Sequence, residues 1–215
     1  EAQNLFGPRS CEIHGIKTFN GAKADDVILK TASVIINTKS PLASVFDDVI
    51  IGKQAILPEV DDIVYEDRLG TTGWIYRKKI LVGTRDLLIH HGVPVLKEDF
   101  EKKYTRKGRK VLYLAEAGKL MAMFVVSYSA DPQLKKALRK LEKSGMTILV
   151  RSADPFINDE SIAELFELPD GYIRVMNSSN GRAFEKYSNL FAQKSPAYIV
   201  HNGSALGLVS AFSAA

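Results

Sequence analysis

Residues 131–155 constrain the fold of this chain more than any other stretch. Asp131 followed by Pro132 is typical of a helix start, because Asp caps the helix and proline at the first helical position loses no hydrogen bond. Apolar residues then recur at helical spacing up to a glycine that predicts the helix end. Residues 147–150 form a short apolar run that predicts a buried strand, and Asp154 follows soon after it. A helix that leads into a buried parallel strand indicates an open α/β sheet, in which ligands bind beyond the carboxyl ends of the strands.

The chain divides into two parts with different patterns. After residue 129, helices alternate with short buried strands, which is typical of a parallel sheet; the expected strands are 147–150, 172–175 and 197–200. Before it, short strands follow one another, as in an antiparallel sheet flanked by helices. We therefore predict an α/β fold with a Rossmannoid domain formed by residues 1–16 and 129–215. An inserted α+β domain is predicted over residues 17–128.

Two motifs resemble the P-type (E1-E2) cation-transporting ATPases. In that family a helix beginning Asp-Pro leads through a glycine into a strand that ends Thr-Gly-Asp, and here the tripeptide is Ser152-Ala153-Asp154. Ser40-Pro41-Leu42-Ala43 is similar to the His-Pro-Leu-Ala of the heavy-metal branch. Ser40 stands in place of the histidine that lies against the adenine in that branch.

Two further motifs follow the same family pattern, and the order along the chain is kept. Residues 65–70 and 79–85 resemble the Gly-x-Gly loop of the nucleotide domain and its later Val-Gly-Asn. Gly70 matches the second glycine of the loop, Arg68 replaces the first, and Gly83 matches the glycine of Val-Gly-Asn. Residues 198–206 align with the magnesium-binding Gly-Asp-Gly-x-Asn-Asp, of which Gly203 is kept.

The resemblance implies a haloacid dehalogenase-like phosphorylation domain with an inserted nucleotide-binding domain. It implies ATP and magnesium as cofactors, a position on the cytoplasmic side of a membrane, and the transmembrane and actuator parts of a parent transporter as partners. The residues that it carries over are Asp154 and Lys186 as catalytic residues and Ser40, Glu66, Gly70 and Gly83 as cofactor-binding residues. No residue is predicted to hold a metal.

The departures from the family pattern predict lost chemistry. Forming an aspartyl-phosphate needs a carboxylate nucleophile and a magnesium site. The Asp-Lys-Thr-Gly-Thr of the family is absent, and Asn202 and Leu206 stand where it has magnesium-binding carboxylates. We therefore expect a head that cannot form the phosphoenzyme.

Two alternatives stay open. One is a non-catalytic regulatory or scaffold module with the same fold. The other is an active ATP-driven cation pump with rewired chemistry that uses Glu1, Asp154 and Asp159. A soluble phosphatase of the haloacid dehalogenase type shares the base fold, but the same missing carboxylates argue against it.

Charge suggests one further partner. The net charge is +4, the isoelectric point is near 9.0, and residues 102–110 hold the densest group of basic side chains. A solvated helix and turn is one interpretation, and weak contact with an anionic membrane surface is the other. Nucleic acid is not predicted as a partner.

The cysteine, the histidines and the hydropathy of the chain argue against a disulfide-bonded protein, a histidine metal site and a membrane-spanning segment. The single cysteine, Cys11, excludes an internal disulfide and predicts a reducing compartment. His90 and His91 are adjacent on an expected helix, so their side chains diverge and do not predict a metal site. The chain has no signal peptide and no apolar run near the roughly 20 residues of a membrane span, so we expect a soluble piece cut from a larger protein.

Overall fold

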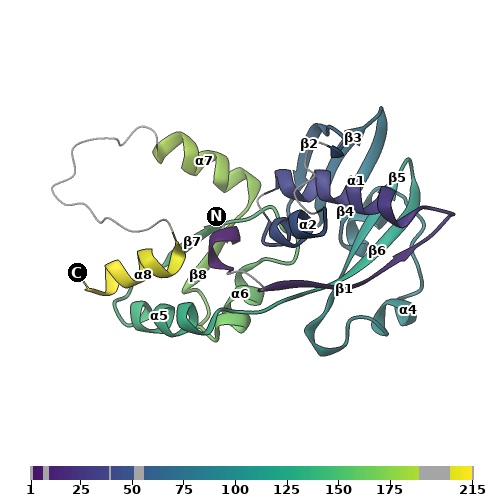
Figure 1. The fold of residues 1–215 in the computed structure, drawn as a ribbon. Helices are drawn as coiled ribbons and strands as arrows, with labels where there is room; N and C mark the ends of the chain where they lie inside the picture. Colours follow the sequence, from purple (N-terminus) through teal and green to yellow (C-terminus); the bar gives the residue numbers. More distant parts are fainter. Residues whose placement is uncertain (1, 7–9, 39, 51–55, 189–203, 215) are drawn as a thin grey trace.

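The computed structural model describes residues 2–6, 10–38, 40–50, 56–188 and 204–214 (Figure 1). The larger part is a six-stranded antiparallel sheet with strand order β1-β6-β5-β4-β3-β2. Its strands are β1 (Cys11–Thr18), β2 (Asp61–Glu66), β3 (Gly70–Ile75), β4 (Lys78–Gly83), β5 (Lys110–Glu116) and β6 (Lys119–Tyr128). The antiparallel sheet predicted for the middle of the chain is therefore present.

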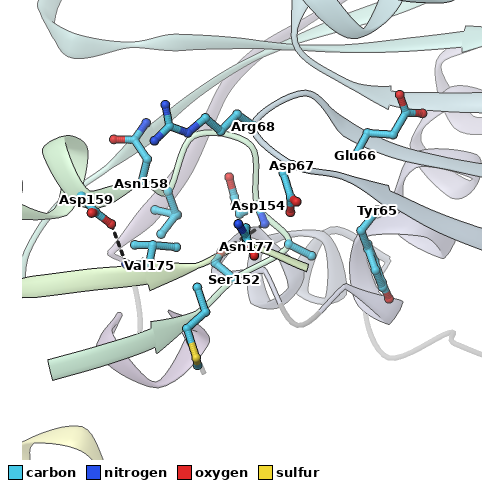
Figure 2. Close-up of a pocket in the computed structure, with 13 residues that line it drawn as sticks. Tyr65, Glu66, Asp67, Arg68, Ser152, Asp154, Asn158, Asp159, Val175 and Asn177 are labelled. Atoms are coloured by element: carbon cyan, nitrogen blue, oxygen red, sulfur yellow. Dashed lines mark hydrogen bonds between the residues drawn. The ribbon is translucent and has the colours of Figure 1, made fainter. Parts of the chain in front are cut away.

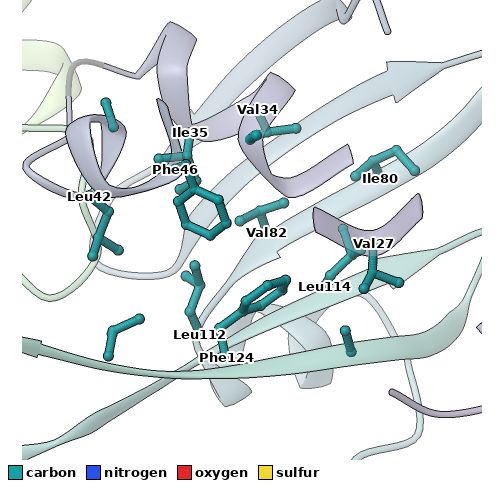
Figure 3. Packing of buried hydrophobic residues seen from close by; sticks show 14 of the residues in the cluster. Val27, Val34, Ile35, Leu42, Phe46, Ile80, Val82, Leu112, Leu114 and Phe124 are labelled. Atoms are coloured by element: carbon teal, nitrogen blue, oxygen red, sulfur yellow. The ribbon is translucent and has the colours of Figure 1, made fainter. Parts of the chain in front are cut away.

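Helices cover both faces of this sheet. One face packs against α1 (Ala24–Asn37) and α2 (Leu42–Ile50), and the other against α3 (Arg85–His90) and the segment around α4 (Glu98–Lys102). Side chains alternate along each strand, so in β5 Leu112 and Leu114 face α1 and α2, whereas Tyr113 faces α3. Figure 3 shows the layer between the sheet and helices α1 and α2. In it the rings of Phe46 and Phe124 pack edge to face, with their centroids 5.5 Å apart.

The smaller part has its own core around a parallel strand pair. β7 (Ile148–Arg151) pairs in parallel with β8 (Ile173–Met176), and four helices accompany them: α5 (Pro132–Glu142), α6 (Asp159–Phe166), α7 (Ser178–Ser188) and α8 (Ala205–Ala214). Leu138 of α5, Phe166 of α6 and Ile173 of β8 are buried together. Two of the three predicted parallel strands are thus observed, and the third, 197–200, lies outside the described residues.

The start of the chain contributes to both parts. The short 3₁₀ turn Ala2–Leu5 packs into the core of the smaller part, whereas β1 pairs with β6 as the outer strand of the large sheet. Residues 11–16, which the sequence pattern groups with 129–215, therefore form part of the sheet edge. Within the described residues, no helix combines the length and apolar character needed to cross a membrane.

Candidate functional site

A cleft of about 320 Å³ lies between the two parts of the molecule (Figure 2). One wall is the turn between β2 and β3, and the other is formed by the segments that follow β7 and β8. This second wall is the carboxyl edge of the parallel strands, where α/β sheets bind ligands. The polar lining residues are Tyr65, Glu66, Asp67, Arg68, Ser152, Asp154, Asn158, Asp159 and Asn177.

Asp154 is buried at the base of the cleft, with 4% of its surface exposed. Its Oδ2 accepts hydrogen bonds from the hydroxyls of Ser40 (2.5 Å) and Tyr128 (2.9 Å), and its Oδ1 accepts one from the backbone N–H of Phe156 (2.9 Å). Burial raises the pKa of the Asp154 carboxyl, and the hydrogen bonds from Ser40, Phe156 and Tyr128 counteract part of that rise. Both carboxylate oxygens are therefore engaged within the protein.

Ser40 lies beneath the cleft and does not line it. It is only 1% exposed, and its Oγ also accepts a hydrogen bond from the backbone N–H of Leu42 at 3.0 Å. This bond satisfies one of the free N–H groups at the start of α2, a position where serine is a preferred capping residue. Ser40 therefore joins the start of α2 to Asp154.

Glu66 lines the cleft at the end of β2. Its Oε1 accepts hydrogen bonds from the hydroxyl of Thr72 (2.6 Å) and from Nε2 of His91 (2.7 Å). The other ring nitrogen of His91, Nδ1, lies 3.0 Å from the ammonium of Lys79, which donates to it. Burial opposes ionisation of Glu66, yet the bonds from Thr72 and His91 lower the pKa of its carboxyl below the ordinary value. Glu66 is thus a fixed anion on the cleft wall.

Gly70 and Gly83 face each other across the pair formed by β3 and β4. A Cβ on Gly70 would lie 2.4 Å from the carbonyl oxygen of Val82, and a Cβ on Gly83 would lie 2.3 Å from that of Leu69. Leu87 of α3 covers both glycines, because its side chain lies only 3.0 and 2.7 Å from where these two Cβ atoms would stand. The two strands and α3 can approach this closely only because both residues lack a side chain.

Lys186 lies apart from this group. It is an exposed residue of α7 and is not among the described residues that line the cleft. Glu1, Asn202 and Gly203 lie outside the described residues. The structure therefore places Asp154 and Glu66 on the lining of one cleft, with Ser40 hydrogen-bonded to Asp154 beneath it and the two glycines in the packing behind it.

Most of the lining residues did not figure among the predicted site residues, and Arg68 and Asn177 are two polar examples. Arg68 holds a left-handed conformation (φ 64°) in the turn after β2, and Figure 2 shows its guanidinium extending toward Asn158. Asn177 follows β8 directly, so its position at a strand's carboxyl end was the signal that could have found it. The motif analysis placed Arg68 in the nucleotide loop only as the replacement of a glycine, and the sequence alone does not place the β2–β3 turn against the segments that follow β7 and β8.

Magnesium prefers hard oxygen ligands, usually including one or two carboxylates. Two of the four carboxylates that line the cleft are already engaged on both oxygens, and Asp154 is the first of them. Asp159 accepts hydrogen bonds from the N–H of Val175 (2.6 Å) and from Arg174 (3.1 Å). Over the part of the chain that is described, no three His, Cys, Asp or Glu side chains gather into a group that could hold a metal ion.

Comparison with known proteins supports the resemblance seen in the motifs. No protein-family model matches the chain. Copper-transporting ATPase 2 of Rhizobium meliloti (strain 1021) is 23% identical over 176 residues, which cover 81% of this chain and 21% of that protein. This match confirms that the chain is similar to the heavy-metal P-type ATPases. The chain spans about a fifth of the length of that relative.

Two solved structures show a partial likeness to this chain. One is the N-domain of HMA6, a copper-transporting P-type ATPase, with a TM-score of 0.46, 16% identity, and coverage of 55% of this chain and 99% of that one. Another is a zinc-transporting PIB-type ATPase in its E2.Pi state, with a TM-score of 0.47, 12% identity, and coverage of 84% of this chain and 29% of that one.

Proposed function

We propose that this chain is the cytoplasmic head of a membrane cation transporter similar to the heavy-metal P-type ATPases. The sequence match to a copper-transporting ATPase and the order of the four motifs support this proposal. In it, the six-stranded sheet with its helices is the nucleotide-binding domain, and β7 and β8 belong to a haloacid dehalogenase-like sheet.

The proposed nucleotide site is the cleft between the two parts. Arg68 supplies a cation for phosphate oxygens, and the ring of Tyr65 is the aromatic surface among the described lining residues on which a base can stack. Ser40, where the family carries a histidine against the adenine, is buried and unable to reach a base in the cleft. We therefore expect weak binding of ATP.

The head does not form an aspartyl-phosphate in this proposal. The observation that carries this is the engagement of Asp154, whose oxygens accept bonds from Ser40, Tyr128 and Phe156. Recruiting Asp154 to magnesium or phosphate would break these bonds and open the junction between the two parts. On this basis we propose a regulatory or scaffold role within the transporter.

Titration of the chain with ATP tests the nucleotide site, with binding monitored through the NMR shifts of the backbone amides. Saturable shifts are expected at Glu66, Arg68 and Asn177, with little difference when magnesium is added. Arg68→Gln should weaken binding by about tenfold or less, as for one charge-assisted phosphate contact. Arg77→Gln is the matched control, because Arg77 is an exposed arginine with φ 63° in the β3–β4 turn, away from the cleft. Equal weakening by both variants, or no saturable shift at all, would contradict the site.

A phosphorylation assay tests the second half of the proposal. The chain is incubated with labelled ATP and magnesium and quenched in acid, and no acid-stable phosphate should remain bound. Stable incorporation that is lost in Asp154→Asn would overturn the proposal and favour the rewired pump.

A further inference from the structure

A second recess lies at the opposite edge of the large sheet from the cleft. Its volume is about 300 Å³, and it is formed by β1, by the neighbouring part of β6 and by the segment after α4. β1 and β2 are the two outer strands of the sheet, so at about 4.8 Å per strand this recess lies roughly 24 Å from the β2 wall of the cleft. Figure 1 shows β1 and α4 along the lower side of the sheet and β2 at its upper end. The two sites are therefore separate.

The recess is basic. Its charged and polar lining side chains are His14, Lys17, Lys103, Tyr104 and Arg109, and none of the described residues that line it is acidic. Arg109 is half-buried, and among the described residues its guanidinium has no ion-pair partner. The nearby carboxylate of Glu12, 3.8 Å from His14 Nε2, is exposed and does not line the recess. A half-buried guanidinium without a counter-ion attracts an anion more strongly than a fully solvated one.

The backbone and two side chains hold this recess in shape. The pairing of β1 with β6 shifts register between Ile13 and Gly15, so His14 is the extra residue of a bulge, and its Nε2 lies 2.8 Å from the hydroxyl of Ser127. Bulges often re-aim a side chain next to a site. The ammonium of Lys17 lies over the ring of Phe100 at 4.6 Å from its centre, which fixes a long side chain that would otherwise be mobile.

We propose that this recess binds a phosphomonoester dianion. Arg109 can donate two parallel hydrogen bonds to one phosphate, and Lys17 and Lys103 add two point charges. The hydroxyl of Tyr104 adds a neutral donor. A phosphomonoester carries a charge of about −1.5 to −2 at pH 7 and three acceptor oxygens, which matches this set better than a carboxylate or a phosphodiester does. The dianion belongs either to a soluble phosphate ester or to a lipid headgroup that projects from a membrane.

Titration with inorganic phosphate tests the site directly. Amide shifts of Gly15, Tyr104 and Gly108 are expected to saturate with a dissociation constant in the millimolar range, and the double variant Lys103→Gln/Arg109→Gln should weaken binding by at least about tenfold. The control is Lys136→Gln/Lys140→Gln on α5. It also removes two positive charges, but from exposed positions away from the recess, and should leave binding unchanged. Arg109→Lys keeps the charge but loses the paired donors, so an intermediate loss is expected even if the double variant does not fold. Absence of saturation, or equal weakening by the control, would overturn the proposal.

A vesicle-binding experiment distinguishes a lipid headgroup from a soluble phosphate ester as the source of the ligand. Binding is compared between vesicles that carry phosphatidate, a phosphomonoester lipid, and vesicles of equal charge that carry phosphatidylglycerol, a phosphodiester. If the protein prefers phosphatidate vesicles and free phosphate abolishes that preference, the ligand is a lipid headgroup. Phosphate binding without that preference assigns it to a soluble ester. Because Lys103 and Arg109 do not line the cleft, failure here leaves the result for ATP at Arg68 unaffected.

Discussion

The hydroxyl of Ser40 donates a hydrogen bond of 2.5 Å to Oδ2 of Asp154, across 114 residues of the chain. This bond joins the start of α2 in the larger part to the loop that follows β7 in the smaller part. Tyr128, the last residue of β6, donates to the same oxygen at 2.9 Å. Two residues whose motifs predict adenine binding and catalysis are therefore hydrogen-bonded to each other.

The first prediction concerns this pair. Ser40→Ala removes both the bond to Asp154 and the cap of α2, so the free energy of unfolding should fall by about 1–3 kcal/mol in urea denaturation. Ser44→Ala is the matched control, since Ser44 lies on the same helix and its hydroxyl donates only to the backbone carbonyl of Pro41. The control should change stability by less than about 1 kcal/mol.

A double-mutant cycle separates the bond from the cap. Ser40→Ala and Asp154→Asn should show a coupling energy of roughly 0.5–3 kcal/mol, as residues in one hydrogen-bonded network do. Additive effects would mean that Ser40 stabilises the protein through α2 alone.

The second prediction concerns the paired glycines. Gly70→Ala and Gly83→Ala each force a methyl group against backbone, and Gly70 also has φ 147°, so each should destabilise the protein by about 2 kcal/mol or more. Thermal unfolding of each variant measures this. Gly181→Ala on α7, where a Cβ meets nothing within 4 Å, should be neutral or slightly stabilising. Wild-type stability of the Gly70 and Gly83 variants, combined with lost ATP binding, would show that these glycines act on the nucleotide and not on packing.

Local signals in the sequence predicted local structure well. The Asp131-Pro132 start of α5 is confirmed, because the Asp131 side chain accepts hydrogen bonds from the N–H groups of Gln133 and Leu134. The antiparallel sheet before residue 129 and the parallel pair of β7 and β8 also follow the predicted pattern. Each of these features depends on residues that are near in sequence or on the period of apolar side chains.

Long-range contacts could not be predicted in the same way. The motif at Ser40 and the motif at Asp154 were each visible, but nothing in either one indicates that they touch. The same holds for Arg68, whose turn meets the segments after β7 and β8 only in the folded chain. Such contacts depend on how two separately packed cores meet, and periodicity carries no information about that.

The third prediction is a pH dependence at Glu116. This buried carboxylate accepts hydrogen bonds from Lys30 (2.5 Å) and Lys78 (2.7 Å). Burial opposes its ionisation, yet these two bonds lower the pKa of Glu116 below its ordinary value of 4.5. A lowered carboxyl pKa contributes stability that is present above the ordinary pKa and is lost as the pH falls through the folded value.

Measuring the free energy of unfolding of the wild type and of Glu116→Gln at several pH values checks the direction of this pH dependence. At pH 7 the variant should be less stable by roughly 1–3 kcal/mol, and the difference should shrink as the pH falls below about 4.5. Asp99→Asn is a control, because Asp99 is an exposed partner of Lys102 at 3.5 Å and such pairs contribute little. A difference that grows toward low pH would contradict the assignment.

The fourth prediction uses Cys11 as a reporter of the junction around Asp154. Cys11 is 6% exposed, and burial together with the charge of Asp154 raises the pKa of its thiol from 9.0 to about 12. Since only the thiolate reacts, labelling by a disulfide reagent at pH 8 should be about a thousandfold slower than for an ordinary thiol. The same chain in denaturant should label at the ordinary rate, which confirms that the reagent is active. Asp154→Asn removes the charge and weakens the bonds to Ser40 and Tyr128, so it should speed the labelling of folded protein. Native Cys11 that labels as fast as the denatured thiol would show that the junction opens readily, and that Asp154 is accessible to ligands after all.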